Sequence, residues 1–234
     1  GNRRARPATQ SGEPRRILLS NELETALSND AEAMADVVKT IHPRLRDVGF
    51  RKRRHTFNRS AEPGIIQVIN FQMGQRSLLG QFTVNFGVAI EEAWLLGRRG
   101  QTAQFPASVN DYDCEIRERL GRILGRQQDV WWGLGGDPYG LAVEIGDAIL
   151  EQGVAWLNTR ATREGILGIW AAGGLTALPT PTALPIVMIL RRLDRPSQAE
   201  ETLRSYYDSI DRAPHKRFVH DLADHLGIDL RGLT

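Results

Sequence analysis

Two different periods of hydrophobic residues divide the first half of this chain into a helix and a set of strands. Over residues 29–48, apolar residues recur every three or four positions, which is the period of one helix face. These residues are Met34, Val37, Val38, Ile41, Leu45 and Val48. Asn29 and Glu32 have the spacing of a capping box, so we expect the helix to begin near Asn29. Pro43 predicts a kink or break, and Gly49 predicts the end of the helix.

From Phe50 onward the period changes to two, which predicts β-strands. The clearest strand covers residues 81–91, where every second residue is apolar. The residues of that apolar face are Phe82, Val84, Phe86, Val88 and Ile90. Residues 51–59 are polar on both faces apart from Phe57, as in an exposed edge strand, and residues 64–73 follow a Pro-Gly turn as a further strand. Short links between these strands predict an antiparallel meander.

Residues 114–124 fit both a helix and a strand. Their apolar side chains recur at helical spacing, whereas Glu115, Arg117 and Arg119 alternate with other residues as one face of a strand would. A turn-rich segment at residues 133–140 then precedes a helix that we expect to continue to about residue 158.

Three further helices are predicted at residues 184–192, 197–210 and 214–226. Ser197 and Glu200 have capping-box spacing, and Gly227 suits a helix C-terminus. The predicted fold class is therefore α+β, with an antiparallel sheet of four or more strands packed on an N-terminal helix and with a C-terminal helical region. The predicted domains are a disordered tail at 1–16, an α+β domain at 17–170, and a helical extension at 171–234 that packs on this domain.

The charge is small overall but unevenly distributed. The net charge is +2, yet residues 1–60 contain 13 Lys and Arg against 7 Asp and Glu, while the remainder contains 17 against 21. Such asymmetry can mark a nucleic-acid interface. Arginine supplies 27 of the 30 basic residues throughout the chain, which indicates a general compositional bias. Because a basic segment without a binding motif is weak support, we do not expect nucleic acid as a partner.

The composition predicts a cytoplasmic protein that does not bind a membrane. No segment approaches the roughly 20 continuous apolar residues of a membrane span. No apolar block of a secretory signal follows the arginine-rich residues 1–16. A single cysteine, Cys114, excludes an internal disulfide and fits a reducing compartment.

The sequence motifs of common catalytic and cofactor sites are missing. No Gly-Lys dipeptide is present, which excludes a phosphate-binding loop of the Walker type, and there is no His-Glu-x-x-His and no Cys-x-x-Cys pair. Cys114 has apolar neighbours and is interpreted as a buried hydrophobic residue. Asp111, Asp113 and Glu115 would share one side of an extended segment, but they lack the ligand count of a calcium site. We therefore expect no catalytic residue, no metal and no cofactor.

Five polar side chains of three predicted strands could form one ligand-binding surface. These candidate residues are Asn70, Gln72, Asn85, Arg117 and Arg119. Within each strand, residues two positions apart share a face. Asn85 and Thr83 therefore share the polar face of residues 81–91, on the side opposite the apolar face. Amides both donate and accept hydrogen bonds, and guanidinium groups suit carboxylate or phosphate. The alternative is structural, because a solvated sheet face also needs polar residues.

The two arginines offer a criterion between these alternatives. Adjacent guanidinium groups repel one another, so a bound anion or nearby carboxylates must offset their charge. Glu115 and Glu118 are the internal candidates. If carboxylates fully pair with both Arg117 and Arg119, the face is structural.

Several motifs of the chain recur together in a known family. They are Gly49-Phe-Arg-Lys-Arg53, Thr56-Phe-Asn-Arg59, residues 66–72, residues 82–88, residues 113–121 and residues 129–134. In order and spacing they resemble the bacterial family catalogued as domain of unknown function 4304, over roughly residues 35–170. The resemblance implies that residues 114–119 form a strand. It brings no established activity, cofactor or catalytic residue, and residues 1–30 and 180–234 lie outside it.

Three functional hypotheses remain. The leading one is a non-catalytic binding or protein-interaction module, whose partner could be another protein. The first alternative is an enzyme that acts on a small anionic substrate through scattered residues such as Asn85, Arg117 and Arg119. The second is nucleic-acid binding through the basic residues 51–59, which steep salt dependence would reveal.

Overall fold

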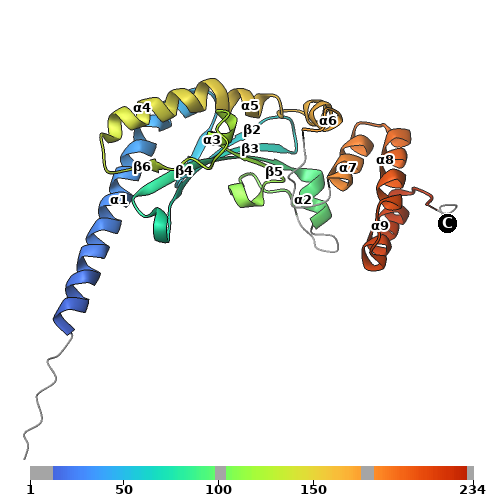
Figure 1. Ribbon diagram of the computed structural model, residues 1–234. Coiled ribbons are helices and arrows are strands. Elements are labelled where there is room, and N and C mark those ends of the chain that lie inside the picture. Colours follow the sequence, from blue (N-terminus) through green and yellow to red (C-terminus); the bar gives the residue numbers. More distant parts are fainter. Residues whose placement is uncertain (1–12, 98–103, 175–181, 231–234) are drawn as a thin grey trace, which may run out of the picture.

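The computed structural model of this chain describes residues 13–97, 104–174 and 182–230, and an antiparallel sheet forms its centre (Figure 1). The strands are β1 (Arg51–Arg53), β2 (Thr56–Ser60), β3 (Ile65–Met73), β4 (Gln81–Ile90), β5 (Ile116–Arg119) and β6 (Trp132–Gly133). The first five are neighbours in chain order, and β6 pairs with the beginning of β4. Each pairing is antiparallel. The predicted meander and the α+β class are therefore confirmed.

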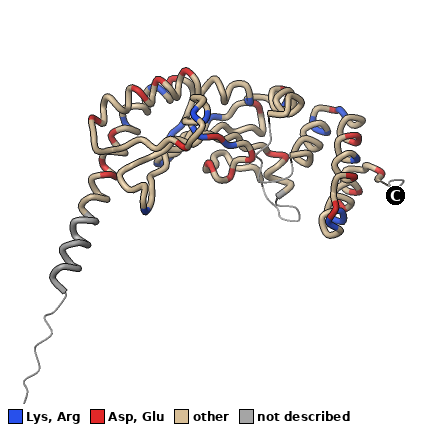
Figure 2. Tube along the Cα trace, in the orientation of Figure 1, with Lys and Arg blue, Asp and Glu red and all other residues tan. Residues whose placement is uncertain are grey.

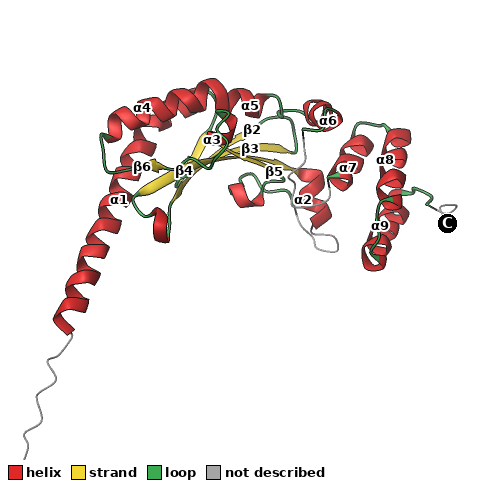
Figure 3. Cartoon of the chain, in the orientation of Figure 1, coloured by secondary structure: helices red, strands yellow, loops and turns green. Residues whose placement is uncertain are grey.

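Strand β4 is buried on both faces. The predicted apolar face, from Phe82 to Ile90, is at most 1% exposed. Helices cover this face: α4 (Pro138–Ala148) and α5 (Val154–Asn158) run along the sheet in Figure 3, and α4 packs beside α1 (Glu13–Asp47). The apolar residues that α1 contributes to this core begin at Met34 and continue every three or four positions to Leu45, as the period predicts.

Helix α1 is longer than its sequence pattern indicated. It begins at Glu13, so the expected start near Asn29 is wrong, and residues 25–29 are exposed and lie outside the core. The helix also continues through Pro43 to Asp47 without a break. Gly49 ends it in a left-handed conformation with φ of +91°, as expected. Of the predicted disordered tail at 1–16, residues 1–12 lie outside the described part of the chain.

The predicted edge strand at residues 51–59 is in fact a hairpin. Arg53 pairs with Thr56, so Arg54 and His55 form a two-residue turn, and Arg54 has a φ of +56°. Within this hairpin β1 is the exposed edge strand, whereas β2 pairs with β1 and β3 and its Phe57 is completely buried. The sequence interpretation missed this turn because it lacks the glycine or asparagine that usually adopts a positive φ.

A segment of π-helix joins α4 to α5 where they cross β4. Ile149–Gly153 forms this segment, and a Cβ at Gly153 would lie 2.3 Å from the Phe86 ring. The Phe86 ring also meets Trp156 at a centroid distance of 6.4 Å. The absence of a side chain at Gly153 therefore allows the helix backbone to approach the sheet closely.

Most of the remaining helices gather at one end of the sheet (Figure 1). They are α2 (Glu91–Gly97), α6 (Arg163–Ala171), α7 (Ala183–Arg192), α8 (Pro196–Asp208) and α9 (Ala213–Leu226). Helix α7 packs against α2 and α8, and α8 packs against α9. The three predicted C-terminal helices are confirmed, including the end at Gly227. The capping box at Ser197 is wrong, because Pro196 begins α8 and Glu200 pairs with Arg204.

A buried ion network connects α6 to the sheet and to α2. The Arg163 side chain is 2% exposed, and its Nε donates to Glu92 Oε1 at 2.5 Å. Its Nη1 donates to Glu62 Oε1 and to the carbonyl oxygen of Pro63, both at 2.8 Å. Gly64 leaves room for this guanidinium, since a Cβ there would lie 2.7 Å from Arg163 Nη2. A charge this deeply buried requires such pairing.

Within the described residues, none of the helices has both the length and the apolar character needed to cross a membrane.

The close approach at Gly153 generates a stability prediction. Gly153→Ala places a methyl group against Phe86, and we expect the free energy of unfolding to fall by about 1–3 kcal/mol in urea titrations. Gly168→Ala is the matched control, because its Cβ would meet nothing within 4 Å in helix α6. Alanine there should leave stability unchanged or raise it by up to about 1 kcal/mol. Equal effects of the two substitutions would contradict this account of the helix crossing.

Candidate functional site

The sheet register places the five predicted ligand-binding residues on one face. Asn70 of β3 pairs with Asn85 of β4, and Asn85 pairs with Arg119 of β5. Directly paired residues in an antiparallel sheet point to the same side, and so do residues two positions apart in one strand. Gln72 and Arg117 therefore join this face, which we call the polar sheet face.

Part of this face is covered, contrary to the expectation of a solvated surface. Thr83 is completely buried, and its hydroxyl donates to the carbonyl oxygen of Val130 at 3.0 Å. Toward the other end of the strands, residues 105–114 pack on a small second core. That core consists of Ile66, Val68, Ala89, Val109 and Cys114, with Trp94 and Phe105 against it. The open part of the face is thus confined to the middle of the sheet.

Cys114 has a packing role within this second core. The Cys114 Sγ atom lies 2.5 Å from the position that a Cβ of Gly87 would occupy. A side chain at position 87 would therefore clash with Cys114, which explains the glycine in the middle of β4. Burial raises the pKa of the Cys114 thiol well above its ordinary value, and nearby Asp111 and Asp113 raise it further. The thiolate needed for nucleophilic chemistry is therefore disfavoured.

The amides of the polar sheet face form one hydrogen-bonded cluster. Asn85 Nδ2 donates to Gln72 Oε1 at 2.8 Å, to Asp111 Oδ2 at 3.2 Å and to Asn70 Oδ1 at 3.4 Å. Asn70 Nδ2 in turn donates to Thr56 Oγ1 at 2.9 Å. These bonds fix the orientation of the amides. On the exposed Gln72 side chain, Nε2 donates to none of the described residues.

The two arginines have different surroundings. Arg119 pairs with the Asp129 carboxylate, and its guanidinium carbon lies 5.3 Å from the centroid of the Trp131 ring. Arg117 is exposed, and no carboxylate of the described residues lies within the 4 Å of an ion pair with it. Neither of the expected partners, Glu115 and Glu118, pairs with either arginine; the Glu118 carboxylate accepts from the backbone N–H of Arg119 instead.

Asp111 is a further residue of this face that the sequence pattern did not indicate as ligand-binding. The irregular segment that precedes β5 brings its carboxylate to the polar sheet face, where it is half-buried and accepts from Asn85. Burial raises the pKa of Asp111 above the ordinary value of 3.8, although Arg117 and hydrogen bonds oppose this shift. The alternation of Asp111, Asp113 and Glu115 indicated a shared side. Asp113 instead caps the turn through Asn110.

Two adjoining cavities lie over the polar sheet face, and they share Gln72, Asp111 and Arg117. The smaller has a volume of about 340 Å³ and contains the arginines of β5. The larger has a volume of about 830 Å³ and extends to the β1–β2 hairpin. Its additional polar lining residues are Lys52, Arg54, His55, Thr56, Asn70 and Tyr112. Figure 2 shows basic positions of the strands and of α3 (Leu120–Ile123) close together in this region.

His55 is a further titratable group of the larger cavity. Burial lowers the pKa of its imidazole below the ordinary value, and the charge of Lys52 lowers it further. The ring is therefore neutral near pH 7 and is available as a hydrogen-bond donor and acceptor.

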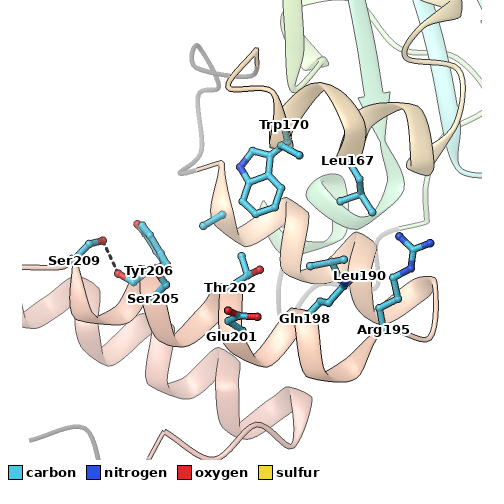
Figure 4. Close-up of a pocket in the computed structure, with 12 residues that line it drawn as sticks. Leu167, Trp170, Leu190, Arg195, Gln198, Glu201, Thr202, Ser205, Tyr206 and Ser209 are labelled. Carbon is cyan, nitrogen blue, oxygen red and sulfur yellow. Dashed lines mark hydrogen bonds between the residues drawn. The ribbon is translucent and has the colours of Figure 1, made fainter.

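A third cavity, of about 640 Å³, lies between α6, α7 and α8 (Figure 4). Trp170 and Leu167 face it from α6, and Glu201 and Tyr206 face it from α8. None of the predicted ligand-binding residues is among the described residues that line this cavity. The polar sheet face is therefore the candidate functional site.

Comparison with protein-family models identifies the family of this chain. The family model described as Domain of unknown function (DUF4304) matches residues 41–159, which contain all five predicted ligand-binding residues. No curated protein and no solved structure matches the chain.

The raised pKa of Asp111 predicts how stability depends on pH. The Asp111 carboxyl group holds its proton more tightly in the folded protein than in the unfolded chain. Its contribution to the free energy of unfolding is therefore lost as the pH rises from the ordinary pKa of 3.8 through the raised pKa of the folded state. Asp111→Asn removes this loss. We therefore expect urea titrations to show the variant gaining stability relative to the parent protein between pH 3 and pH 7. A constant difference across this range would contradict the prediction.

Proposed function

Since the chain belongs to the family Domain of unknown function (DUF4304), whose description states no activity, we propose a function from the geometry of its polar sheet face. We infer that the protein is a non-catalytic binding protein and that this face binds a small ligand through a phosphate or carboxylate group.

The observation that carries this proposal is the difference between the two arginines of β5. Asp129 neutralises Arg119, so the ion pair alone explains the presence of this guanidinium group. Arg117 lies on the same strand face, lines both cavities and has no ion-pair partner among the described residues. A guanidinium group offers several donors in a planar fork that matches phosphate or carboxylate. The unpaired arginine therefore supports a ligand.

The amide cluster beside Arg117 supports the same conclusion. Asn85 is 8% exposed, and its hydrogen bonds hold Gln72 in place before any ligand binds. A site whose polar groups are already oriented loses less side-chain entropy on binding. Asp111 limits the charge of the ligand, because a highly charged anion would repel its carboxylate.

A second candidate function is catalysis on the same kind of ligand. The larger cavity holds Asp111 with a raised pKa and His55 with a lowered pKa. Titratable groups with shifted pKa values in a cavity are typical of active sites. Conversion of a bound ligand would favour this alternative over simple binding.

Calorimetric titration with inorganic phosphate and with acetate tests the proposed function. Arg117→Ala removes one charge-assisted contact worth about 1.5–3 kcal/mol, so we expect anion affinity to fall by about 10- to 100-fold with an unchanged melting temperature. Arg119→Ala should instead lower the melting temperature, because it breaks the contacts to Asp129 and Trp131.

Arg126→Ala serves as the matched control, since Arg126 is exposed near the same strand but lines neither cavity. It should change neither affinity nor stability. An Arg117→Ala variant with undiminished anion binding, or a parent protein that binds neither probe, would show that the polar sheet face is structural.

A further inference from the structure

An exposed aromatic ring stands at the larger cavity. Tyr112 lines this cavity and is 69% exposed. Its hydroxyl oxygen accepts a hydrogen bond from Asn110 Nδ2 at 2.7 Å. Asn110 is itself held by Asp113 in a capped turn, so the ring has a fixed position at the cavity edge. A large aromatic side chain that is exposed and fixed in this way is suited to stacking.

Three cationic side chains line the larger cavity together with Tyr112. Lys52 and Arg54 come from the β1–β2 hairpin, and Arg117 comes from β5. Asp111 is the one acidic side chain among the described residues that line this cavity. The cavity therefore presents an aromatic surface and a cationic surface to the same ligand.

We propose that the ligand of the polar sheet face is a mononucleotide, whose base stacks on Tyr112 and whose phosphate binds Arg117. This inference rests on the proposed function and names its ligand class. A nucleotide combines a planar aromatic ring with a phosphate, and stacking on tyrosine together with arginine contacts is a common way to bind both. The volume of about 830 Å³ lies within the range of small-molecule sites.

The remaining polar groups of the cavity fit the other parts of a nucleotide. Asp111 is an acceptor for a ribose hydroxyl group. The amides of Asn70 and Gln72 can donate to and accept from the edge of a base. Each of these three side chains lines the larger cavity with Tyr112.

A single nucleotide suits the charges better than a nucleic-acid strand does. The smaller cavity continues beyond Arg117, and the carboxylates of Asp111, Glu118 and Asp129 line it together with Arg117, Arg119 and Arg122, so its three carboxylates balance its three guanidinium groups. A strand that crossed this region would place further phosphates beside these carboxylates. The basic residues of the β1–β2 hairpin would then compensate the phosphate charges of only one part of the nucleic-acid strand.

The test compares nucleoside monophosphates with ribose 5-phosphate in calorimetric titrations of the full chain. Adenosine, guanosine, cytidine and uridine monophosphates are the probes, and we expect at least one to bind about 5- to 100-fold tighter than ribose 5-phosphate. Tyr112→Ala should abolish this difference and leave ribose 5-phosphate binding unchanged. Tyr112→Phe retains the ring and should retain most of the difference. Tyr139→Ala is the matched control, because Tyr139 is also 69% exposed but lies on α4.

Each other outcome overturns the inference in a distinguishable way. If ribose 5-phosphate binds and no nucleotide binds tighter, the mononucleotide proposal is wrong and the proposed anion-binding function is retained. If Tyr112→Ala weakens ribose 5-phosphate as much as the nucleotide, the ring does not stack on a base. If no probe and no simple anion binds, the proposed function also fails. If a single-stranded oligonucleotide binds tighter than every mononucleotide, with an affinity that falls steeply with salt, the ligand is a nucleic acid.

Discussion

The burial of β4 on both faces is the constraint on which the rest of the structure depends. Strand β4 pairs with β3, β5 and β6, so the positions of three other strands follow from it. On one face its phenylalanines form the core under α1, α4 and α5. On the other face, Asn85 organises the amide cluster and Gly87 admits the side chain of Cys114. The same strand therefore supplies the stability of the fold and the geometry of the candidate site.

The two arginines that β5 contributes to the polar sheet face have different charge partners. Arg119 forms an ion pair within the protein with Asp129, whereas Arg117 has no ion-pair partner among the described residues. The Arg119–Asp129 pair is itself partly exposed, so its contribution to folding is about 0–1 kcal/mol. This difference between the two arginines is the observation from which we propose anion binding. The fixed ring of Tyr112 at the adjacent cavity agrees with this interpretation.

The sequence was informative where a regular period decided the structure. The alternation of residues 81–91 and the helical period up to Leu45 both correspond to faces that are buried in the structure. It was less informative where single residues adopt special conformations, as Arg54 does in the β1–β2 turn. The five candidate residues could be found because strand periodicity assigns each of them to a face. Asp111, Tyr112 and Asp129 could not, because irregular segments without any period bring them to the same surface.

The Arg163 network bears on where the independently stable part of this chain ends. The family match ends at residue 159, four positions before Arg163, whose guanidinium forms ion pairs with both Glu62 and Glu92. A fragment cut at that boundary would keep both carboxylates and lose their counter-charge, and Glu92 is 6% exposed in the intact protein. A fragment begun at residue 41 would also lack Met34, Val37 and Val38 of the core. The smallest autonomous unit of this protein is therefore larger than the segment by which its family is identified.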